Sequence, residues 1–422
     1  MEIIETFGHT VEKLCEESPE KARTLLKTGW KAQGLKFRLF PDRRLMPADR
    51  YLAKLMMDTM LKPLKNPADS AIVSIFTPCE LLLETGLSPY NAEAFSCYVS
   101  ASKAEGFCME QALSDGISET LCSYHKTFLG AAKKGLLPRP RCIVYTNLIC
   151  DANLVTFRAL ADLYQVPSFF IDVPLKQNEE NVRYVADQLK ELAAFLEEQT
   201  GREIDEERLK ERVASSSRSL KNYQQFQKAR AGKYIPTDLV THLYAGMTQN
   251  ILLGSREEEK YTEMLLKDVE KAAPLRGKRI YWMHTIPFWS SAVREALAFK
   301  EDAQIVGCEL AQVFDGELDP EKPYESMARR MVSHNLNGGI SRRIEAGIRH
   351  AKEAGADGAV WFAHWGCKHT LGGARLAKKR FEEAGIPLLI LDGDGCDQSY
   401  GGEGQTSTRL GAFLEMLGGA HE

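Results

Sequence analysis

The chain has 422 residues, of which 44% are hydrophobic and 27% charged, and it carries a net charge of −4. This composition is ordinary for a globular protein and leaves room for two or three domains. The weak negative charge argues against a nucleic-acid-binding surface, and no apolar run is long enough to cross a membrane. The first residues do not follow the basic-then-apolar pattern of a signal peptide. We therefore expect a cytoplasmic protein whose ten cysteines are thiols or metal ligands rather than disulfides.

The first part of the chain predicts a helical segment followed by an α/β unit. Residues 1–65 are charged and helical in pattern, and residues 66–177 alternate strands with helices. The strands expected in this unit lie at 71–76, 142–147 and 168–173. Residues 178–275 are rich in Glu, Lys and Arg and repeat apolar residues with a helical period, which predicts a helical connection that crosses between lobes.

A second α/β unit is predicted over residues 276–422. Its strands are expected from residue 278 onward, at 303–310, at 358–364 and at 387–394, with helices between them. Strands alternating with helices of about ten to fifteen residues are typical of parallel sheets. We therefore expect an α/β protein with two doubly wound, Rossmann- or flavodoxin-like parallel-sheet lobes and added helices.

Two segments, one in each unit, share the same order of features. Residues 143–172 and 359–392 each contain an apolar run, a turn with one cysteine, a helix with an arginine eight residues after that cysteine, and a proline before a second apolar run that ends in Asp. The two cysteines, Cys150 and Cys367, follow predicted strands. Open α/β sheets bind ligands at the carboxyl ends of their strands. The repeat therefore predicts that each lobe offers a thiolate to an inorganic cofactor held between them.

Five cysteines share this strand-end position, and a sixth lies between helices beside a serine and a histidine. The five are Cys79, Cys150, Cys308, Cys367 and Cys396, and the sixth is Cys122, with Ser123 and His125 next to it. The chain has no CxxC pair for zinc, no ferredoxin-type CxxCxxC run and no phosphate-binding GxxxxGK[ST] loop. Six dispersed thiolates suit two cubane clusters with three protein ligands each, which leaves iron open to a substrate.

Two alternatives to cluster binding apply to these cysteines. Any single cysteine is as often a small buried hydrophobe as a ligand. Cys122, with His125 nearby, could also be a nucleophile activated by a base, although sequence proximity is weak evidence for such a pair.

Six motifs that contain or flank these cysteines carry a family resemblance. They are TPCELLLETGLSP (77–89), LCSYHK (121–126), TNLICDAN (146–153), FFIDVP (169–174), HWGCK (364–368) and GQTSTRLGAFLEML (404–417). In these motifs the chain resembles the 2-hydroxyacyl-CoA dehydratase D-component family. The resemblance implies that Cys122, Cys150 and Cys367 hold one [4Fe–4S] cluster.

The further cysteines Cys79, Cys308 and Cys396 make the chain look more like the double-cubane cluster proteins of that family. This resemblance implies two [4Fe–4S] cubanes bridged by sulfide, a homodimer, and an ATP-hydrolysing iron–sulfur activator that delivers low-potential electrons. It implies an oxygen-sensitive iron–sulfur oxidoreductase that reduces a small-molecule substrate. Cys97 or Cys142 could replace one of the three outer ligands.

Two other functions stay open at this point. One is a 2-hydroxyacyl-CoA dehydratase subunit with a single cluster, a lyase that eliminates water from an acyl-CoA together with a related second subunit. The other is a cluster-carrying accessory protein that transfers electrons without being an enzyme.

Side chains beside the thiolates are the candidates for setting the cluster potential and delivering protons. The strongest are Ser123, His125 and His364, and the others are Asn147, Asp151, Lys368 and His369. Asp151 also suits the start of a helix without any role in catalysis. Trp365 is expected to pack over the cofactor.

Overall fold

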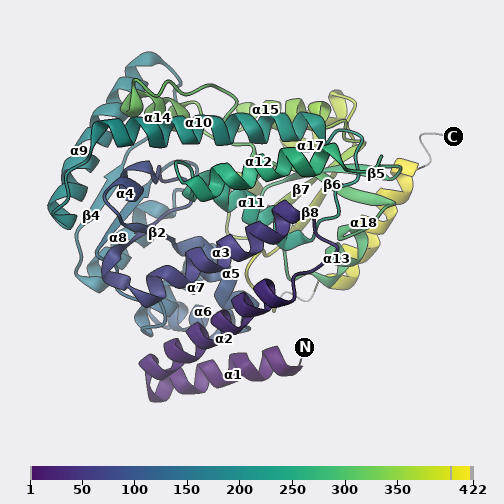
Figure 1. The fold of residues 1–422 in the computed structure, drawn as a ribbon. Coiled ribbons are helices and arrows are strands. Elements are labelled where there is room, and N and C mark those ends of the chain that lie inside the picture. Colours follow the sequence, from purple (N-terminus) through teal and green to yellow (C-terminus); the bar gives the residue numbers. More distant parts are fainter. Residues whose placement is uncertain (1, 400–401, 419–422) are drawn as a thin grey trace.

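Within residues 2–399 and 402–418, which the computed structural model describes, eight strands form two parallel sheets of four (Figure 1). The first sheet has the order β2-β1-β3-β4 and consists of β1 (Ser70–Val73), β2 (Ser88–Asn91), β3 (Cys142–Thr146) and β4 (Ser168–Ile171). The second has the order β6-β5-β7-β8 and consists of β5 (Lys278–Met283), β6 (Ala303–Cys308), β7 (Gly358–His364) and β8 (Leu388–Gly393). Both sheets thus have the strand order of flavodoxin-like folds, and the predicted fold class is confirmed.

The central strands are apolar and lie beneath helices. Every residue of β1, β3 and β7 is buried, as expected for parallel strands beneath helices. The matching strand orders also place β3 and β7 at equivalent positions. In each sheet the switch point, where ligands bind, lies beside that strand, between β1 and β3 and between β5 and β7.

Two details of the first sheet differ from the prediction. Strand β2, with the sequence SPYN, was not predicted because Ser, Pro and Asn are poor strand formers; its proline lies on an edge strand, where a missing N–H is tolerated. The strand expected at 71–76 ends at Val73. It ends there because Ser74 and Thr77 close a turn, with 3.0 Å between their hydroxyl oxygens.

Helices precede and surround the first sheet. The chain begins with α1 (Glu2–Glu17), α2 (Pro19–Leu39), α3 (Pro47–Lys65) and the short 3-10 helix η1 (Pro67–Asp69). Between the strands lie α4 (Glu80–Glu84), α5 (Ala92–Ala101), α6 (Glu105–Ser114), α7 (Ser123–Lys133) and α8 (Asn153–Tyr164). Gly86, with a φ of 78°, ends the α4 segment by adopting the left-handed conformation that glycine tolerates.

A helical segment separates the two sheets in the sequence. It contains α9 (Glu179–Thr200), α10 (Glu206–Ala229), α11 (Leu239–Ile251) and α12 (Arg256–Glu270). The side chains of Asn178 and Asp205 cap the first turns of α9 and α10 by accepting backbone N–H groups. Helix α10 runs along the top of the view in Figure 1, and α9 packs against α14 of the second unit.

Helices also surround the second sheet. They are α13 (Ser291–Leu297), the 3-10 helix η2 (Glu309–Ala311), α14 (Pro323–Val332), α15 (Ile340–Glu353), α16 (Lys368–Leu371), α17 (Ala374–Glu383) and α18 (Glu403–Gly418). The outermost residues of the predicted first and last segments lie outside the described part of the chain. Among the described residues, none of the helices combines the length and the apolar character that a membrane crossing requires.

The two lobes share one hydrophobic core and several polar contacts. The core includes Ile72 and Val144 from the first sheet and Ile280 and Val360 from the second. Glu80 of the first lobe and Arg330 of the second form a buried ion pair, in which Nη2 of Arg330 donates to Oε2 of Glu80 at 2.9 Å. Continuous packing of this kind fixes the strand ends of the two sheets relative to each other.

Candidate functional site

A cavity of about 340 Å³ lies where loops of both lobes meet. Its walls include the segments that follow β1, β3, β5 and β7, the first turns of α5 and α7, and part of α11. The carboxyl ends of strands in both sheets therefore face one cavity, as predicted from the sequence repeat.

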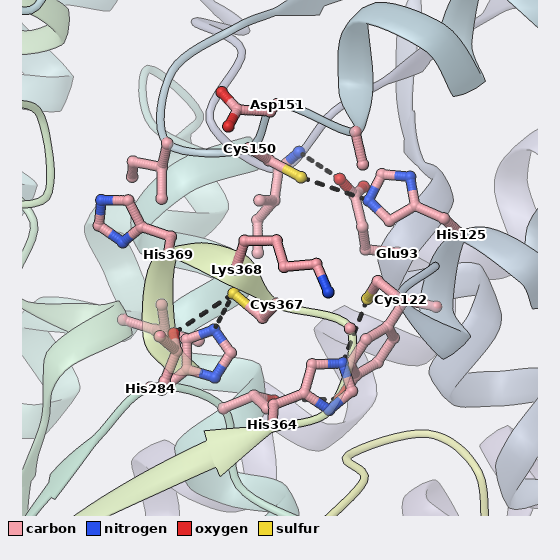
Figure 2. A pocket seen from close by; sticks show the side chains of 18 of the residues that line it. Glu93, Cys122, His125, Cys150, Asp151, His284, His364, Cys367, Lys368 and His369 are labelled. Atoms are coloured by element: carbon pink, nitrogen blue, oxygen red, sulfur yellow. Dashed lines mark hydrogen bonds between the residues drawn. The ribbon is translucent and has the colours of Figure 1, made fainter. Parts of the chain in front are cut away.

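Three cysteines project into this cavity from three separate loops (Figure 2). Cys122 precedes α7, Cys150 follows β3, and Cys367 follows β7. These three are partly accessible, whereas the other seven cysteines of the chain are buried. Gly366 brings the loops together: a Cβ on this glycine would lie 2.6 Å from the backbone N and Cα of Cys122.

Each of the three thiols contacts one imidazole. The Sγ–Nε2 distance is 3.2 Å from Cys122 to His364, 3.5 Å from Cys150 to His125 and 3.6 Å from Cys367 to His284. Burial lowers the pKa of His125 to about 3 and lowers the pKa values of the other two rings. All three rings are therefore neutral near pH 7, with one N–H and one lone pair each.

The partners of the opposite ring nitrogens decide where the protons of two rings lie. The backbone N–H of Gly395 donates to Nδ1 of His364 at 3.1 Å, so the ring proton is on Nε2 and points at Cys122. The hydroxyl of Thr156 donates to Ala152 O and therefore accepts from Nδ1–H of His125 at 2.8 Å. Nε2 of His125 then presents a lone pair to Cys150. The first imidazole is thus a donor to sulfur, and the second is an acceptor for a thiol proton.

Burial disfavours the thiolate forms of Cys122 and Cys150 unless a positive group accompanies them. Burial raises the pKa of Cys150 to about 12, and the nearby Cys367 adds to the rise. Burial and then the two neighbouring cysteines hold the pKa of Cys122 well above its usual range. Metal binding reverses this preference because a coordinating thiol loses its proton.

The three thiols surround a space rather than a point (Figure 2). Within the described ranges, no three His, Cys, Asp or Glu side chains form a group that could hold a metal ion. A soft donor set of three sulfurs around a cavity fits an iron–sulfur cluster, which thiolates hold.

Glu93 is a cavity residue that sequence reasoning missed. It lies in the first turn of α5, two residues after β2. Its Oε2 accepts from Asn91 Nδ2 at 2.8 Å, and its Oε1 accepts from the backbone N–H of Ile75 at 3.4 Å. Burial raises the pKa of Glu93 to about 7. The only available sequence signal was its place after a strand, and that strand was not recognised.

His284 and Arg343 were also missed. His284 follows β5 with a φ of 76°, and its Nδ1 is buried without a hydrogen-bond partner. Arg343 of α15 is 2% exposed and donates through two nitrogens to Glu309, at 2.7 and 2.6 Å. Its remaining terminal nitrogen donates to His369 and Thr370, at 2.9 and 3.0 Å. A histidine directly after a predicted strand could have been noticed, but nothing in the pattern of α15 singles out this arginine.

The three outer cysteines of the predicted set lie outside the cavity lining. Cys79 is fully buried, with its Sγ 3.3 Å from the carbonyl oxygen of Thr77. The Sγ of Cys308 lies 3.7 Å from the carbonyl oxygen of His284, and that of Cys396 lies 3.6 Å from the hydroxyl of Thr127. Their role as ligands stays a prediction.

The two cysteines named as substitutes are placed differently from each other. Cys97 of α5 lines the cavity, although it is only 8% exposed. Cys142 begins β3 and is fully buried.

Most of the other predicted side chains line the cavity. His125, Asp151, His364, Lys368 and His369 line the cavity, and Figure 2 shows the side chain of Lys368 running between the three thiols.

Three of the predicted residues lie elsewhere. Ser123 donates to Asp394 at 2.6 Å and thus joins the lobes. Asn147 donates to Asp172 at 2.6 Å. Trp365 is 44% exposed and is not among the cavity residues.

Residues 74–417 match the model of the family described as 2-hydroxyglutaryl-CoA dehydratase, D-component. The chain belongs to this family. The resemblance found in the sequence motifs is confirmed, and the family is one of dehydratases.

Individual dehydratase subunits are similar to this chain at about a quarter identity. The (R)-phenyllactyl-CoA dehydratase alpha subunit of Clostridium sporogenes is 24% identical over 366 residues, covering 81% of this chain and 87% of its own. The lactoyl-CoA dehydratase subunit alpha of Anaerotignum propionicum is 24% identical, covering 81% and 88%. The (R)-2-hydroxyglutaryl-CoA dehydratase subunit alpha of Acidaminococcus fermentans is 26% identical, covering 67% of this chain but only 61% of its own length.

Proposed function

We propose that this protein is a subunit of a 2-hydroxyacyl-CoA dehydratase in which Cys122, Cys150 and Cys367 hold one [4Fe–4S] cluster. The observation that carries this proposal is the convergence of the only three partly accessible cysteines of the chain on one cavity between the lobes. Family membership favours the dehydratase over the small-molecule reductase, because the relatives named above are dehydratase subunits.

The histidines would prepare the thiols for the cluster in two different ways. His125 presents a lone pair to the thiol of Cys150 and would orient it. Because burial lowers the pKa of His125 to about 3, the ring would not keep the proton that the thiol loses on coordination, and that proton would pass to solvent. His364 donates Nε2–H to the sulfur of Cys122, which stabilises negative charge on that sulfur. Lys368 adds a positive charge between the sulfurs (Figure 2). When bound, the cluster would supply electron transfer and Lewis-acid iron.

Glu93 is the group of the chain best placed to handle the substrate proton. Elimination of water from a 2-hydroxyacyl thioester removes the hydroxyl from C2 and a proton from C3. Asn91 and the backbone of Ile75 orient the carboxyl group of Glu93 in the cavity. Its pKa of about 7 balances accepting against returning a proton at neutral pH. We therefore assign to Glu93 the removal of the C3 proton.

The proposal includes two protein partners. Relatives named as alpha and beta subunits of one dehydratase are both similar to this chain, which supports a related second subunit. The family resemblance also implies an ATP-hydrolysing iron–sulfur activator, which would deliver a low-potential electron to the cluster.

The first experiment is to measure iron and acid-labile sulfide per chain on protein purified without oxygen. We expect about four irons, and we expect Cys122→Ala, Cys150→Ala and Cys367→Ala each to lose most of them. The matched control is Cys108→Ala, which removes a buried thiol of α6 outside the cavity.

Two results would change the assignment. About eight irons per chain, lost on replacement of Cys79, Cys308 and Cys396, would favour the double-cubane reductase and its homodimer. Absence of iron from strictly anaerobic protein would contradict both cluster proposals.

A further inference from the structure

One region of the cavity is lined by apolar side chains that do not belong to the three loops carrying Cys122, Cys150 and Cys367. Helix α11 supplies Leu243 and Met247, and η2 supplies Leu310. Asn250 Nδ2 ties the two elements together by donating to Gly246 O at 2.6 Å and to Leu310 O at 3.2 Å. Leu243, Met247 and Leu310 therefore form one continuous surface, which we call the apolar wall.

The segment after β1 and the loop before α15 extend this apolar lining. Phe76 and Leu336 both line the cavity. The ring of Phe76 packs edge-on against the ring of His334, with 5.1 Å between the centroids, which brings the two segments together. Because of this contact, the apolar lining reaches from α11 to both lobes.

The charged groups that line the cavity lie on other segments than the apolar wall. Arg343 directs its guanidinium to Glu309, His369 and Thr370, so each of its three nitrogens already has a partner. Lys368 directly follows Cys367 and lies among the thiols of Cys122, Cys150 and Cys367, as Figure 2 shows. We call this part of the cavity the thiol region. Glu93 is an acid, so it offers no positive charge to a ligand.

The three residues of the apolar wall are uncharged, so a ligand group there would meet no cation on the wall itself. A carboxylate moved from water to such a place loses its hydration without gaining a partner, which is costly. An uncharged hydrocarbon group gains instead, by about fourfold in affinity for each buried methylene.

We propose that the apolar wall, with Phe76 and Leu336, receives the side chain of the acyl group and selects branched or aromatic hydrocarbon side chains over side chains that end in a carboxylate. The inference rests on the proposed function and adds the substrate class to it. The thiol region would take the cluster and the reacting carbons, and the apolar region would take the far end of the acyl chain.

Binding of a matched set of CoA thioesters to the iron-loaded protein tests this inference. The probes are 2-hydroxy-4-methylpentanoyl-CoA, 2-hydroxyglutaryl-CoA and lactoyl-CoA, measured by anaerobic titration calorimetry. We expect the first to bind at least about tenfold more tightly than either of the others. Equal or tighter binding of 2-hydroxyglutaryl-CoA would overturn the inference.

A substitution in the wall supplies a second readout. Met247→Ala should weaken binding of the methylpentanoyl thioester by about five- to tenfold and leave lactoyl-CoA within about twofold, because the shorter group does not reach the wall. The matched control is Met109→Ala, which truncates another buried methionine, on α6 and outside the cavity. Leu243→Ala repeats the test at a second position of the wall, in case one variant folds poorly.

The outcomes separate this inference from the proposed function. If all three thioesters bind with the same affinity, or if both wall variants behave like the control, the substrate class is wrong and the dehydratase proposal stands. If iron-loaded protein binds no thioester at all, the proposed function fails and the inference fails with it.

Discussion

The two lobes place a carboxylate at equivalent points, Glu93 just after edge strand β2 and Glu309 just after edge strand β6. Glu309 is held by two nitrogens of the buried Arg343 and also accepts the backbone N–H of His284 at 2.9 Å. The partners of Glu93 are neutral instead: the amide of Asn91 and backbone N–H groups, including that of Ile75. One carboxylate is therefore neutralised and fixes the backbone of a histidine, whereas the other is left able to exchange a proton.

This difference divides the work of the site between the lobes. In the second lobe, the pair of Glu309 and Arg343 orients His284 and Thr370, and both of these contact Cys367. In the first lobe, Glu93 faces the cavity with a pKa of about 7. The two lobes thus hold an acid at matching positions but give it different partners.

Removing the carboxyl group of Glu93 tests the chemical half of this comparison. Glu93→Gln should lower turnover of a 2-hydroxyacyl-CoA by about 100- to 10,000-fold, the range for loss of a general base, with iron content unchanged. The measurement is turnover with the partner subunit and activator present. The matched control is Glu105→Gln, because burial also raises the pKa of Glu105 to about 7 and this residue lies outside the cavity. Equal activity in the two variants would remove Glu93 from the mechanism.

Removing the guanidinium of Arg343 tests the structural half. Arg343→Met leaves the carboxylate of Glu309 buried without a counter-charge, which should lower the free energy of unfolding by about 3–5 kcal/mol. Chemical denaturation measures this loss. Arg329→Met is the control, since Arg329 and Glu179 form a similar two-bond pair at the surface, where such pairs contribute about 0–1 kcal/mol. Similar losses in the two variants would mean that burial does not set the difference.

The pH dependence of stability gives a third, smaller contrast. The pKa of Glu93 is about 7 in the folded protein against an ordinary value of 4.5, so between these values the folded state binds more protons than the unfolded state. Stability from this group is present below about pH 4.5 and is lost as the pH rises through about 7. Relative to wild type, Glu93→Gln should therefore gain up to about 3 kcal/mol between about pH 5 and about pH 8. Urea titrations at the two pH values measure the gain, and a constant difference would contradict the raised pKa.

The sequence was most informative about strand ends that are followed by a distinctive loop. Cys150 and Cys367 were predicted to be equivalent, and they do follow β3 and β7, which occupy the same place in the two sheets. The parallel sheets and the order of helices also follow from the alternation of apolar runs. These features depend on local patterns, which a single sequence contains.

The rest of the site depends on the directions in which side chains point, and a sequence pattern does not specify these directions. Cys308 ends β6 and lies at a predicted strand end, yet its thiol is not part of the cavity lining. The side chains of a strand alternate between faces, so a shift of one residue turns a thiol away from the ligand side. Met247 and Arg343 reach the cavity from helices, and only tertiary packing decides which side of a helix does so.

The contact of Gly366 with the backbone of Cys122 has a consequence for the life of the chain in the cell. Two thiols leave the ribosome early, and the third follows only after the 217 residues that separate positions 150 and 367 have been synthesised, roughly 10 to 40 s later at ordinary rates of translation. During that interval no complete set of ligands exists. The proposed cluster can therefore acquire its full set of protein ligands only after synthesis has passed residue 367.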